Sequence, residues 1–191
     1  MPTDRELVIQ LQSGCLCALG ELYERHRQLV YRTALAVTGD PAASADLLQD
    51  VFLRIHRFAH KIDPDRPLEP WLYRTTVNLT YTWVKRHKRL LRPLEDIAEW
   101  FSGGSKEYPA NISEKDEEWE EVRKAISKLP IMQRMVVVLY YINDLPLQEI
   151  SEVINVPVGT VKSRLYYGRK ALKEHLGTRA GKIPEVQYEF T

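Results

Sequence analysis

The sequence lacks the features that mark a membrane protein, a secreted protein or a metalloprotein. Its 191 residues hold no apolar run close to the roughly 20 residues that span a bilayer, and the first residues, MPTDRELVIQ, have no signal-peptide pattern. The two cysteines, Cys15 and Cys17, form a C-x-C whose spacing we expect to be too short for an easy disulfide, and no second Cys or His pair stands nearby to complete a zinc site. The sequence therefore predicts a cytoplasmic protein without a membrane span, a metal or a cofactor, in which both cysteines are buried small residues.

Residue arrangements that carry catalysis are also missing. The five histidines share no spacing, and no paired carboxylates, nucleophile with an adjacent base, or phosphate-binding loop occurs at a working spacing. The composition, with 44% hydrophobic and 28% charged residues, is that of a globular protein that can bury a core. The formal net charge of +1 conceals a strong segregation of acidic and basic residues along the chain. We therefore expect a binding protein and not an enzyme.

The stretch LPLQEISEVINVPVGTVKSRLYYGRKAL, from Leu145 to Leu172, predicts two helices joined by a tight turn. Apolar residues recur at three- and four-residue steps, stop at Asn155 and resume after Pro157. The second helix carries polar and basic residues away from this apolar stripe, and Gly159 with Thr160 in its first turn would let a phosphate backbone approach. This pattern is typical of a helix-turn-helix that reads the major groove of DNA, and an ordinary helical hairpin with a solvated basic face is the alternative.

Two helices are predicted before residue 60. Apolar positions keep helical spacing from Ala18 to Val37, and a second helix begins near Ala42. This second helix is expected to bury Ala45, Leu48, Val51, Phe52 and Ile55 and to expose Asp46, Gln49, Asp50 and Arg54. The exposed face is either solvated decoration or a docking surface. The prolines of the segment IDPDRPLEP then predict a stiff loop.

A third helix should begin at Pro70 and run to about Arg92. Its sequence, PWLYRTTVNLTYTWVKRHKRLLR, interleaves four aromatic residues with Arg, Lys and Asn. Rings that stack on bases and cations that hold phosphates are what single-stranded or melted nucleic acid requires. A basic surface helix over a Trp-rich core is the alternative.

An acidic segment, Pro93 to Glu121, separates these helices from the rest. It has ten acidic residues against two lysines, a net charge of −8, with Gly103, Gly104 and Pro109 in its middle. Ser113 with Asp116 resembles a capping box that starts a helix ending before Pro130, and MQRMVVVLYYI forms the next. The sequence thus predicts an all-α protein of two small helical domains joined by a flexible acidic linker. The first domain comprises residues 1–92, the linker residues 93–113, and the helix-turn-helix domain residues 114–177. Residues 178–191 are expected to form a loose tail.

In order and spacing, these parts resemble the bacterial extracytoplasmic-function sigma factors of the sigma-70 family over roughly residues 10 to 177. Four stretches carry the resemblance: ELYERHRQLVYRTALAVTGDPAASADLLQDVFLRIHRF, PWLYRTTVNLTYTWVKRHKR, LPIMQRMVVVLYYINDLPLQEISEVI and VPVGTVKSRLYYGRKAL. The resemblance implies that the first two form a domain that docks on the RNA polymerase clamp and opens the −10 promoter element. The last two would form the domain that reads the −35 element.

The resemblance also implies roles for individual residues. The residues expected to bind polymerase are Asp46, Leu48, Gln49, Asp50 and Phe52. The residues expected at the −10 element, where the loop Asp65 to Glu69 would shape a pocket for a flipped base, are Asp65, Arg66, Trp71, Arg74, Asn78, Lys85 and Arg86. The residues expected at the −35 element are Thr160, Lys162, Ser163, Arg164, Tyr166 and Tyr167.

Three residues depart from the family pattern. Pro146 replaces the usual Ser or Thr cap, Ser151 replaces a small apolar residue, and Tyr167 stands where relatives often carry Arg. Because Tyr cannot make the bidentate contact of Arg to guanine, the −35 sequence stays open.

The resemblance further implies core RNA polymerase, promoter DNA and an anti-sigma factor as partners. It also implies a linker, Leu94 to Ser113, that enters the active-site cleft of polymerase, while a plain spacer is the alternative. The alternative function is a free-standing helix-turn-helix regulator with an N-terminal sensing or partner-binding domain, and the surface from Asp46 to Phe52 separates the two.

Overall fold

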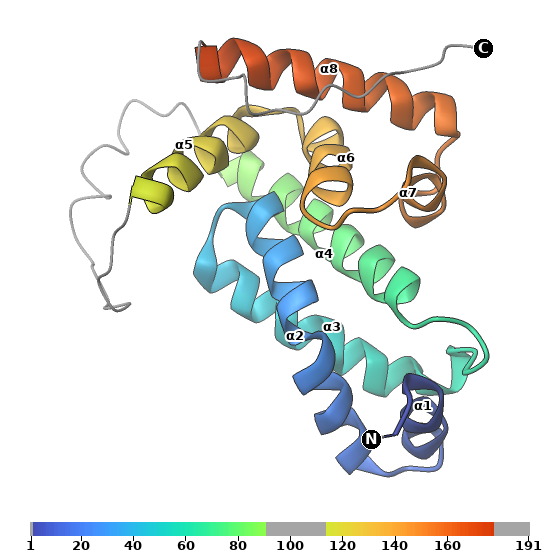
Figure 1. Cartoon of the computed structure of the whole chain (residues 1–191). Coiled ribbons are helices and arrows are strands. Elements are labelled where there is room, and N and C mark those ends of the chain that lie inside the picture. The colour runs from blue at the N-terminus through green and yellow to red at the C-terminus, as the bar shows by residue number, and fades with distance from the viewer. Residues whose placement is uncertain (1, 91–113, 178–191) are drawn as a thin grey trace.

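The computed structural model describes residues 2–90 and 114–177, and all regular structure in these ranges is helical. The elements are α1 Asp4–Gln12, α2 Leu16–Thr38, α3 Pro41–Phe58, the short 3₁₀ helix η1 Ala59–Lys61, α4 Glu69–Leu90, α5 Glu114–Lys128, α6 Ile131–Tyr141, α7 Leu147–Ile154 and α8 Val158–Leu176. Figure 1 shows α1 to α4 as one group and α5 to α8 as a second group above it. The prediction of an all-α protein with two helical domains is confirmed. The predicted linker and tail lie outside the described residues.

Local signals set the helix ends where the sequence predicts them. Gly39 ends α2 in the left-handed conformation, with φ of 72°, and the Asp40 side chain caps α3 by accepting the Ala43 amide at 3.0 Å. Asn155, with φ of 54°, ends α7 in the same left-handed conformation, and Pro157 precedes α8. The tight turn of the helix-turn-helix therefore follows from Asn155 and Pro157.

One buried position of α3 differs from the prediction. Ala45 is exposed, and Ser44 takes the inward position although it is polar. The Ser44 hydroxyl is satisfied there, because it donates to the Asp40 carbonyl at 2.6 Å and lies 3.0 Å from the Thr38 hydroxyl. A buried hydroxyl costs little once it is hydrogen-bonded, so the inward stripe can include Ser44 and leave Ala45 in solvent.

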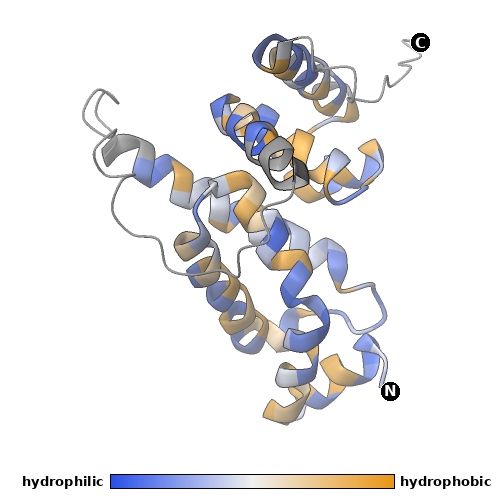
Figure 2. Ribbon diagram, turned by 60° about the vertical axis from the view of Figure 1, so that its left-hand side comes forward, coloured by the Kyte–Doolittle hydropathy of each residue, from blue (hydrophilic) through white to orange (hydrophobic). Residues whose placement is uncertain are grey.

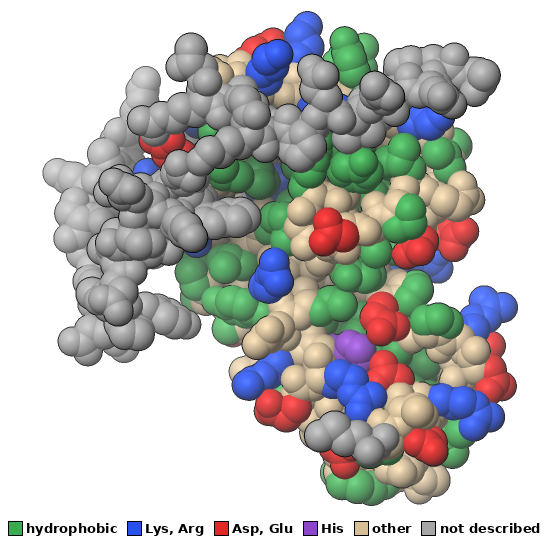
Figure 3. All heavy atoms as spheres, in the orientation of Figure 1, with side chains coloured by type: hydrophobic (Ala, Val, Ile, Leu, Met, Phe, Trp, Pro, Cys, Tyr) green, Lys and Arg blue, Asp and Glu red, His purple; other side chains and the backbone are tan. Residues whose placement is uncertain are grey.

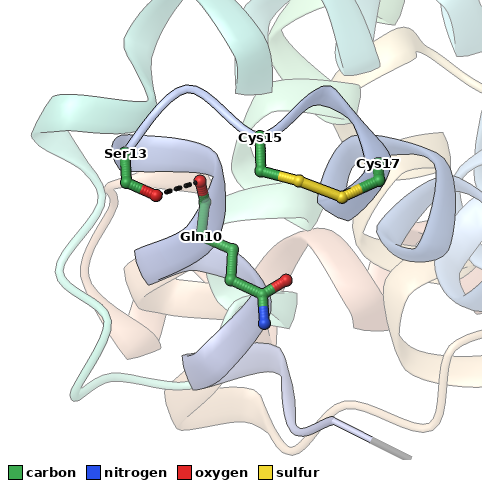
Figure 4. Close-up of a disulfide and its surroundings, with 4 residues drawn as sticks. All are labelled: Gln10, Ser13, Cys15 and Cys17. Atoms are coloured by element: carbon green, nitrogen blue, oxygen red, sulfur yellow. Dashed lines mark hydrogen bonds between the residues drawn. A yellow bond between two sulfur atoms is a disulfide. The ribbon is translucent and has the colours of Figure 1, made fainter.

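The expectation for the two cysteines is wrong. Cys15 and Cys17 form a disulfide, with Cα atoms 5.4 Å apart, and Cys17 is exposed (Figure 4). The backbone allows it because Cys15 is the extended N-cap of α2 and Cys17 already lies in the first helical turn. The change of direction between cap and helix brings the two Cα atoms to a separation that is usual for disulfides.

Two apolar clusters hold the helices. The N-terminal cluster joins α1, α2, α3, η1 and the start of α4, and Figure 2 shows orange and blue residues alternating along these helices, as expected of helices with one apolar side. The second cluster centres on α5 to α8 but also includes Val37, Tyr73 and Val77 from α2 and α4. The two helical groups therefore share apolar core, which the sequence did not predict.

Polar contacts reinforce the boundary between the groups. Arg134 of α6, 4% exposed, donates to the Val37 carbonyl at 2.7 Å and also to the carbonyls of Ser127 and Leu129. Burial lowers the pKa of Arg134 from its ordinary value, and these carbonyl acceptors compensate the buried charge. Asn143 donates to the Thr33 hydroxyl at 2.9 Å. The carbonyl end of α2 is thus tied to the C-terminal helices.

Across residues 2–90 and 114–177, the helices are too short or too polar to cross a membrane.

Candidate nucleic-acid interface

The predicted polymerase-binding residues of α3 divide into an exposed set and a buried set. Asp46, Gln49 and Asp50 are exposed, whereas Leu48 and Phe52 are 9% and 5% exposed and belong to the N-terminal core. Phe52 packs there edge-to-face on Tyr23, with ring centroids 5.0 Å apart. Only the three polar side chains can therefore reach a partner directly.

The sequence analysis missed an apolar residue on this same face. Leu53 of α3 is 63% exposed, an unusual environment for leucine. It follows Asp46, Gln49 and Asp50 at helical spacing, so the four side chains share one side of the helix. This spacing was visible in the sequence, and it would have placed Leu53 with the three polar residues. We call Asp46, Gln49, Asp50 and Leu53 the α3 face.

The loop before α4 is exposed and held by short polar contacts. Asp63 Oδ1 accepts the Asp65 amide at 3.0 Å, and the Asp63 carboxylate lies 3.3 Å from the Arg66 guanidinium. Arg5 of α1 donates to Asp65 Oδ1 at 2.7 Å. Asp65 and Arg66 are therefore accessible to a ligand. Trp71, in the first turn of α4, is half-buried against the N-terminal core.

The residues of α4 predicted to bind the −10 element are exposed, apart from Trp71. Arg74, Asn78, Lys85 and Arg86 are exposed, while Tyr73, Thr76, Val77 and Thr80 are buried. The aromatic rings expected among them are engaged locally: Trp83 stacks on His87 at 4.0 Å between centroids, and Lys85 lies over Tyr81 at 5.8 Å. The helix thus has a buried side of mainly apolar and small polar residues and an exposed side of polar and basic residues, and its role in nucleic-acid binding stays a prediction.

Two of these residues face the helix-turn-helix. Arg74 Nη2 donates to the Glu152 carbonyl at 2.5 Å, and Arg74 and Asn78 line a pocket together with Val153, Ile154 and Asn155 of α7 and its cap. The structure therefore places two of the predicted −10 residues, Arg74 and Asn78, against the helix-turn-helix that is predicted to read the −35 element, a contact that spacing along the sequence did not indicate.

The second helix of the helix-turn-helix presents a mixed polar and aromatic side. Ser163 is exposed, and Tyr166 and Tyr167 are 49% and 57% exposed, with their rings edge-to-face at 5.4 Å. Thr160, Lys162 and Arg164 are half-buried. A Cβ added at Gly159 would meet no atom within 4 Å, so the first turn of α8 is open to an approaching backbone. The six predicted −35 residues all lie on this one helix.

Two features of the surface bear on metals and on charge. Asp4, His26 and Glu69 bring ligand atoms within 4.8 Å of one another, but the Asp4 carboxylate already pairs with His26 Nε2 at 2.7 Å and with Arg25. These contacts make the group a hydrogen-bonded anchor for α1. In Figure 3, acidic and basic side chains mix over the lower, N-terminal half, so that part of the face shows no large patch of one sign.

Two family models match the chain: Sigma-70 region 2 over residues 22–90, and Sigma-70, region 4 over residues 119–172. The chain is 29% identical over 179 residues to the ECF RNA polymerase sigma factor SigW of Bacillus subtilis (strain 168), covering 90% of this chain and 96% of the relative. It is 31% identical over 179 residues to the ECF RNA polymerase sigma-E factor of Escherichia coli (strain K12), covering 89% and 92%. A solved structure of CnrH in complex with the cytosolic domain of CnrY matches with a TM-score of 0.65 and 26% identity, over 91% of this chain and 96% of that one.

Proposed function

The chain belongs to the extracytoplasmic-function sigma factors of the sigma-70 family, and from this premise we propose which of its surfaces perform each step of promoter recognition. A sigma factor of this family binds core RNA polymerase and directs promoter-specific transcription initiation. The observation that carries the proposal is the order of exposed polar surfaces along the chain: the α3 face, then the loop and outer side of α4, then α8. We assign residues 1–92 to polymerase binding and the −10 element, and residues 114–177 to the −35 element.

The α3 face binds the clamp of core polymerase. Its carboxylates Asp46 and Asp50 and the amide of Gln49 offer charged and polar contacts, and Leu53 offers an apolar anchor that loses its contact with water on docking. Leu48 and Phe52 contribute indirectly. They are buried and hold α3 against α2, and so position the exposed residues of the α3 face.

The −10 element is opened by the loop before α4 and by α4 itself. Asp65 and Arg66 of the loop and Trp71 in the first turn of α4 form the wall of a site for a flipped base, with Trp71 half-buried against the N-terminal core. The exposed Arg74, Asn78, Lys85 and Arg86 follow the single strand, since cations hold phosphates and an amide can read a base edge.

The −35 element is read by α8. Gly159 and Thr160 admit the phosphate backbone at the start of the helix, and Lys162, Ser163 and Arg164 reach the groove one turn further on. The exposed pair Tyr166 and Tyr167 adds contacts that an arginine in that place would not make, through ring faces and hydroxyl groups.

Promoter binding requires the two helical groups to separate. The nominal positions −35 and −10 differ by about 25 base pairs, or roughly 85 Å along B-DNA at 3.4 Å per pair. In the structure α7 contacts both α4 and α8, so the two reading surfaces are about two helix spacings apart, on the order of 20 Å. The described arrangement is therefore the closed form of the protein.

The remaining assignments concern partners and location. The related protein CnrH forms a complex with the cytosolic domain of CnrY, and by this likeness a protein partner, an anti-sigma factor, regulates this chain. Transcription places the protein in the cytoplasm. The chain supplies no catalytic step, because polymerase performs the chemistry. The acidic linker enters the polymerase channel through its carboxylates, which lie outside the described residues: Glu95, Asp96, Glu99 and Glu107.

Comigration with core polymerase on a sizing column tests the proposal. Asp46→Lys combined with Asp50→Lys should abolish comigration, because the α3 face would then repel the part of the clamp that the two carboxylates attract. Both sites are exposed, so the circular dichroism spectrum and the melting temperature should stay unchanged. Glu21→Lys combined with Glu174→Lys makes the same charge change on exposed sites of α2 and α8 and is the control. Comigration of the Asp46/Asp50 variant at the wild-type affinity would contradict the assignment of the α3 face, whereas a wild-type chain that fails to comigrate would favour a free-standing regulator.

A further inference from the structure

Helix α1 is built into the N-terminal core although it precedes both matched regions. The family models match residues 22–90 and 119–172, so α1 lies before the first of them. Its residues Leu7, Val8 and Leu11 are at most 5% exposed, in the same cluster as Ile62 and Leu68, which bracket the loop before α4. Figure 1 shows α1 lying beside that loop. The helix therefore contacts the segment that the proposed function assigns to the −10 element.

One side of α1 is fixed to α2. Thr3 and Glu6 form a capping box, in which the Thr3 amide donates to Glu6 at 2.7 Å and the Thr3 hydroxyl accepts the Glu6 amide at 3.3 Å. Asp4 is held by Arg25 and by His26, which is 5% exposed. After α1, the Cys15 amide donates to the Gln10 carbonyl at 3.0 Å and the Ser13 hydroxyl to the same carbonyl at 2.7 Å, next to the disulfide (Figure 4). These contacts set the position of α1 on α2.

The other side of α1 holds the start of the loop. The side-chain amide of Gln12 donates to two carbonyls, Ala59 at 3.0 Å and Ile62 at 2.8 Å, and both contacts are partly buried. The Ala59 carbonyl, at the start of η1, also accepts the Ile62 amide at 3.0 Å, so Gln12 is a second donor there, while the Ile62 carbonyl lies just past the end of η1. Arg5 reaches further along the loop, to Asp65 at 2.7 Å, with both side chains exposed.

We propose that Gln12, with a smaller contribution from Arg5, is a positioning residue that fixes the loop of residues 62–68 for recognition of the −10 base. This inference rests on the proposed function, in which that loop walls the base site. Gln12 acts through two partly buried hydrogen bonds to backbone, whereas Arg5 acts through one exposed ion pair that solvent screens. Without Gln12 the Ile62 carbonyl loses this side-chain donor and the Ala59 carbonyl keeps only the Ile62 amide, so the loop samples positions in which the base site is not formed.

The test is a −10 selection by holoenzyme, made from core polymerase and full-length variants, on a library with one fixed −35 sequence and randomised −10 bases. We expect Gln12→Ala to lower the preference at one −10 position about tenfold, and Arg5→Ala to lower it less at the same position. Affinity for core polymerase should stay unchanged. The control is Gln10→Ala, which changes the same residue type on the exposed side of α1 and should select as wild type does.

The readout separates positioning from a loss of folded protein. Fewer folded molecules would lower the yield of all sequences alike, whereas a misplaced loop changes the preference among them. Wild-type preference in both Gln12→Ala and Arg5→Ala would overturn the inference. Should Gln12→Ala unfold, Arg5→Ala decides alone, since its side chain is 58% exposed and holds no core. Arg66→Ala and Trp71→Ala change the base site itself and therefore distinguish a failure of the proposed function of the loop from a failure of the role of α1. If they also leave the preference unchanged, the proposed function of the loop fails; if they alone change it, only the role of α1 fails.

Discussion

The guanidinium of Arg74 lies 2.5 Å from the backbone carbonyl of Glu152, so a residue proposed to hold the −10 strand is bound by the first helix of the helix-turn-helix. Asn78, one turn further along α4, lines the pocket beside this contact. In the closed form, nucleic acid and α7 therefore compete for one side of α4. A locked interface between the helical groups should prevent initiation without changing either reading surface.

A cross-link across the interface should block promoter opening. The Thr33 and Asn143 side chains are in hydrogen-bond contact at 2.9 Å, so cysteines at these two positions lie close enough to be joined by oxidation or by a short thiol-reactive linker. In a Cys15→Ser, Cys17→Ser background, Thr33→Cys with Asn143→Cys should lose more than tenfold of promoter-dependent run-off transcription when cross-linked. Reduction of the disulfide form should restore it. The background without the new cysteines, given the same oxidant, is the control, and full activity of the cross-linked protein would contradict the need for separation.

Two glycines should respond in opposite ways to alanine. A Cβ on Gly168 of α8 would lie 2.8 Å from Val137 Cγ2 of α6, so Gly168→Ala forces the packed helices apart and should cost about 1–3 kcal/mol of unfolding free energy. Gly20 of α2 has no neighbour within 4 Å of such a Cβ, and Gly20→Ala should stabilise by about 0.5–1 kcal/mol through helix propensity. Chemical denaturation of both variants measures the difference. A Gly168→Ala protein as stable as wild type would show that Val137 moves aside freely.

Gly159 should matter for DNA and not for the fold. Its Cβ would point into open space, so Gly159→Ala should leave the melting temperature unchanged or slightly raised. The methyl group would nevertheless keep the phosphate backbone from the first turn of α8, and affinity of holoenzyme for −35 duplex should fall several-fold on all sequences alike. Titration of fluorescent duplexes at several salt concentrations checks this. An unchanged affinity would remove the phosphate contact from the start of α8.

Trp71 has both a packing role and a proposed base contact, which two measurements separate. Trp71→Ala should weaken open-complex formation by about 1–3 kcal/mol, the range found for loss of one base–aromatic stack. Because Trp71 is half-buried on the N-terminal core, the melting temperature should also fall. On a promoter that is already melted at −10, the variant should still bind more weakly than wild type. Normal binding to that premelted template, with only a lower melting temperature, would leave Trp71 a core residue.

Local signals allowed most helices to be predicted. The prediction of α4 from Pro70 differs from the observed start at Glu69 by one residue, and the end of the first helix of the helix-turn-helix at Asn155 is confirmed. Helix α1 was missed although Thr3 and Glu6 have capping-box spacing before Leu7, Val8 and Leu11. The helix is short, so its apolar residues gave little periodicity, but the capping box could have been recognised in the sequence.

The contact between the helical groups was not readable from sequence. Val37, Tyr73 and Val77 have the same spacing as core residues of their own helices, and nothing in a periodic pattern says which neighbour covers them. The disulfide was not predicted for a related reason. It depends on the change from extended to helical backbone after Cys15 and not on residue spacing. For the candidate site, the sequence identified residue types, but their exposure decided which of them are accessible, as Leu48, Phe52 and Leu53 illustrate.

The shared core also determines the order in which this protein can be completed during synthesis. Chains emerge from the ribosome N-terminus first, so α1 to α4 can assemble while the helices that cover Val37, Tyr73 and Val77 are still being made. For that interval the nascent domain shows an uncovered apolar side, the kind of surface that chaperones and neighbouring chains bind. The chain itself can close this side only when α5 to α7, the helices that contact α2 and α4, have left the ribosome.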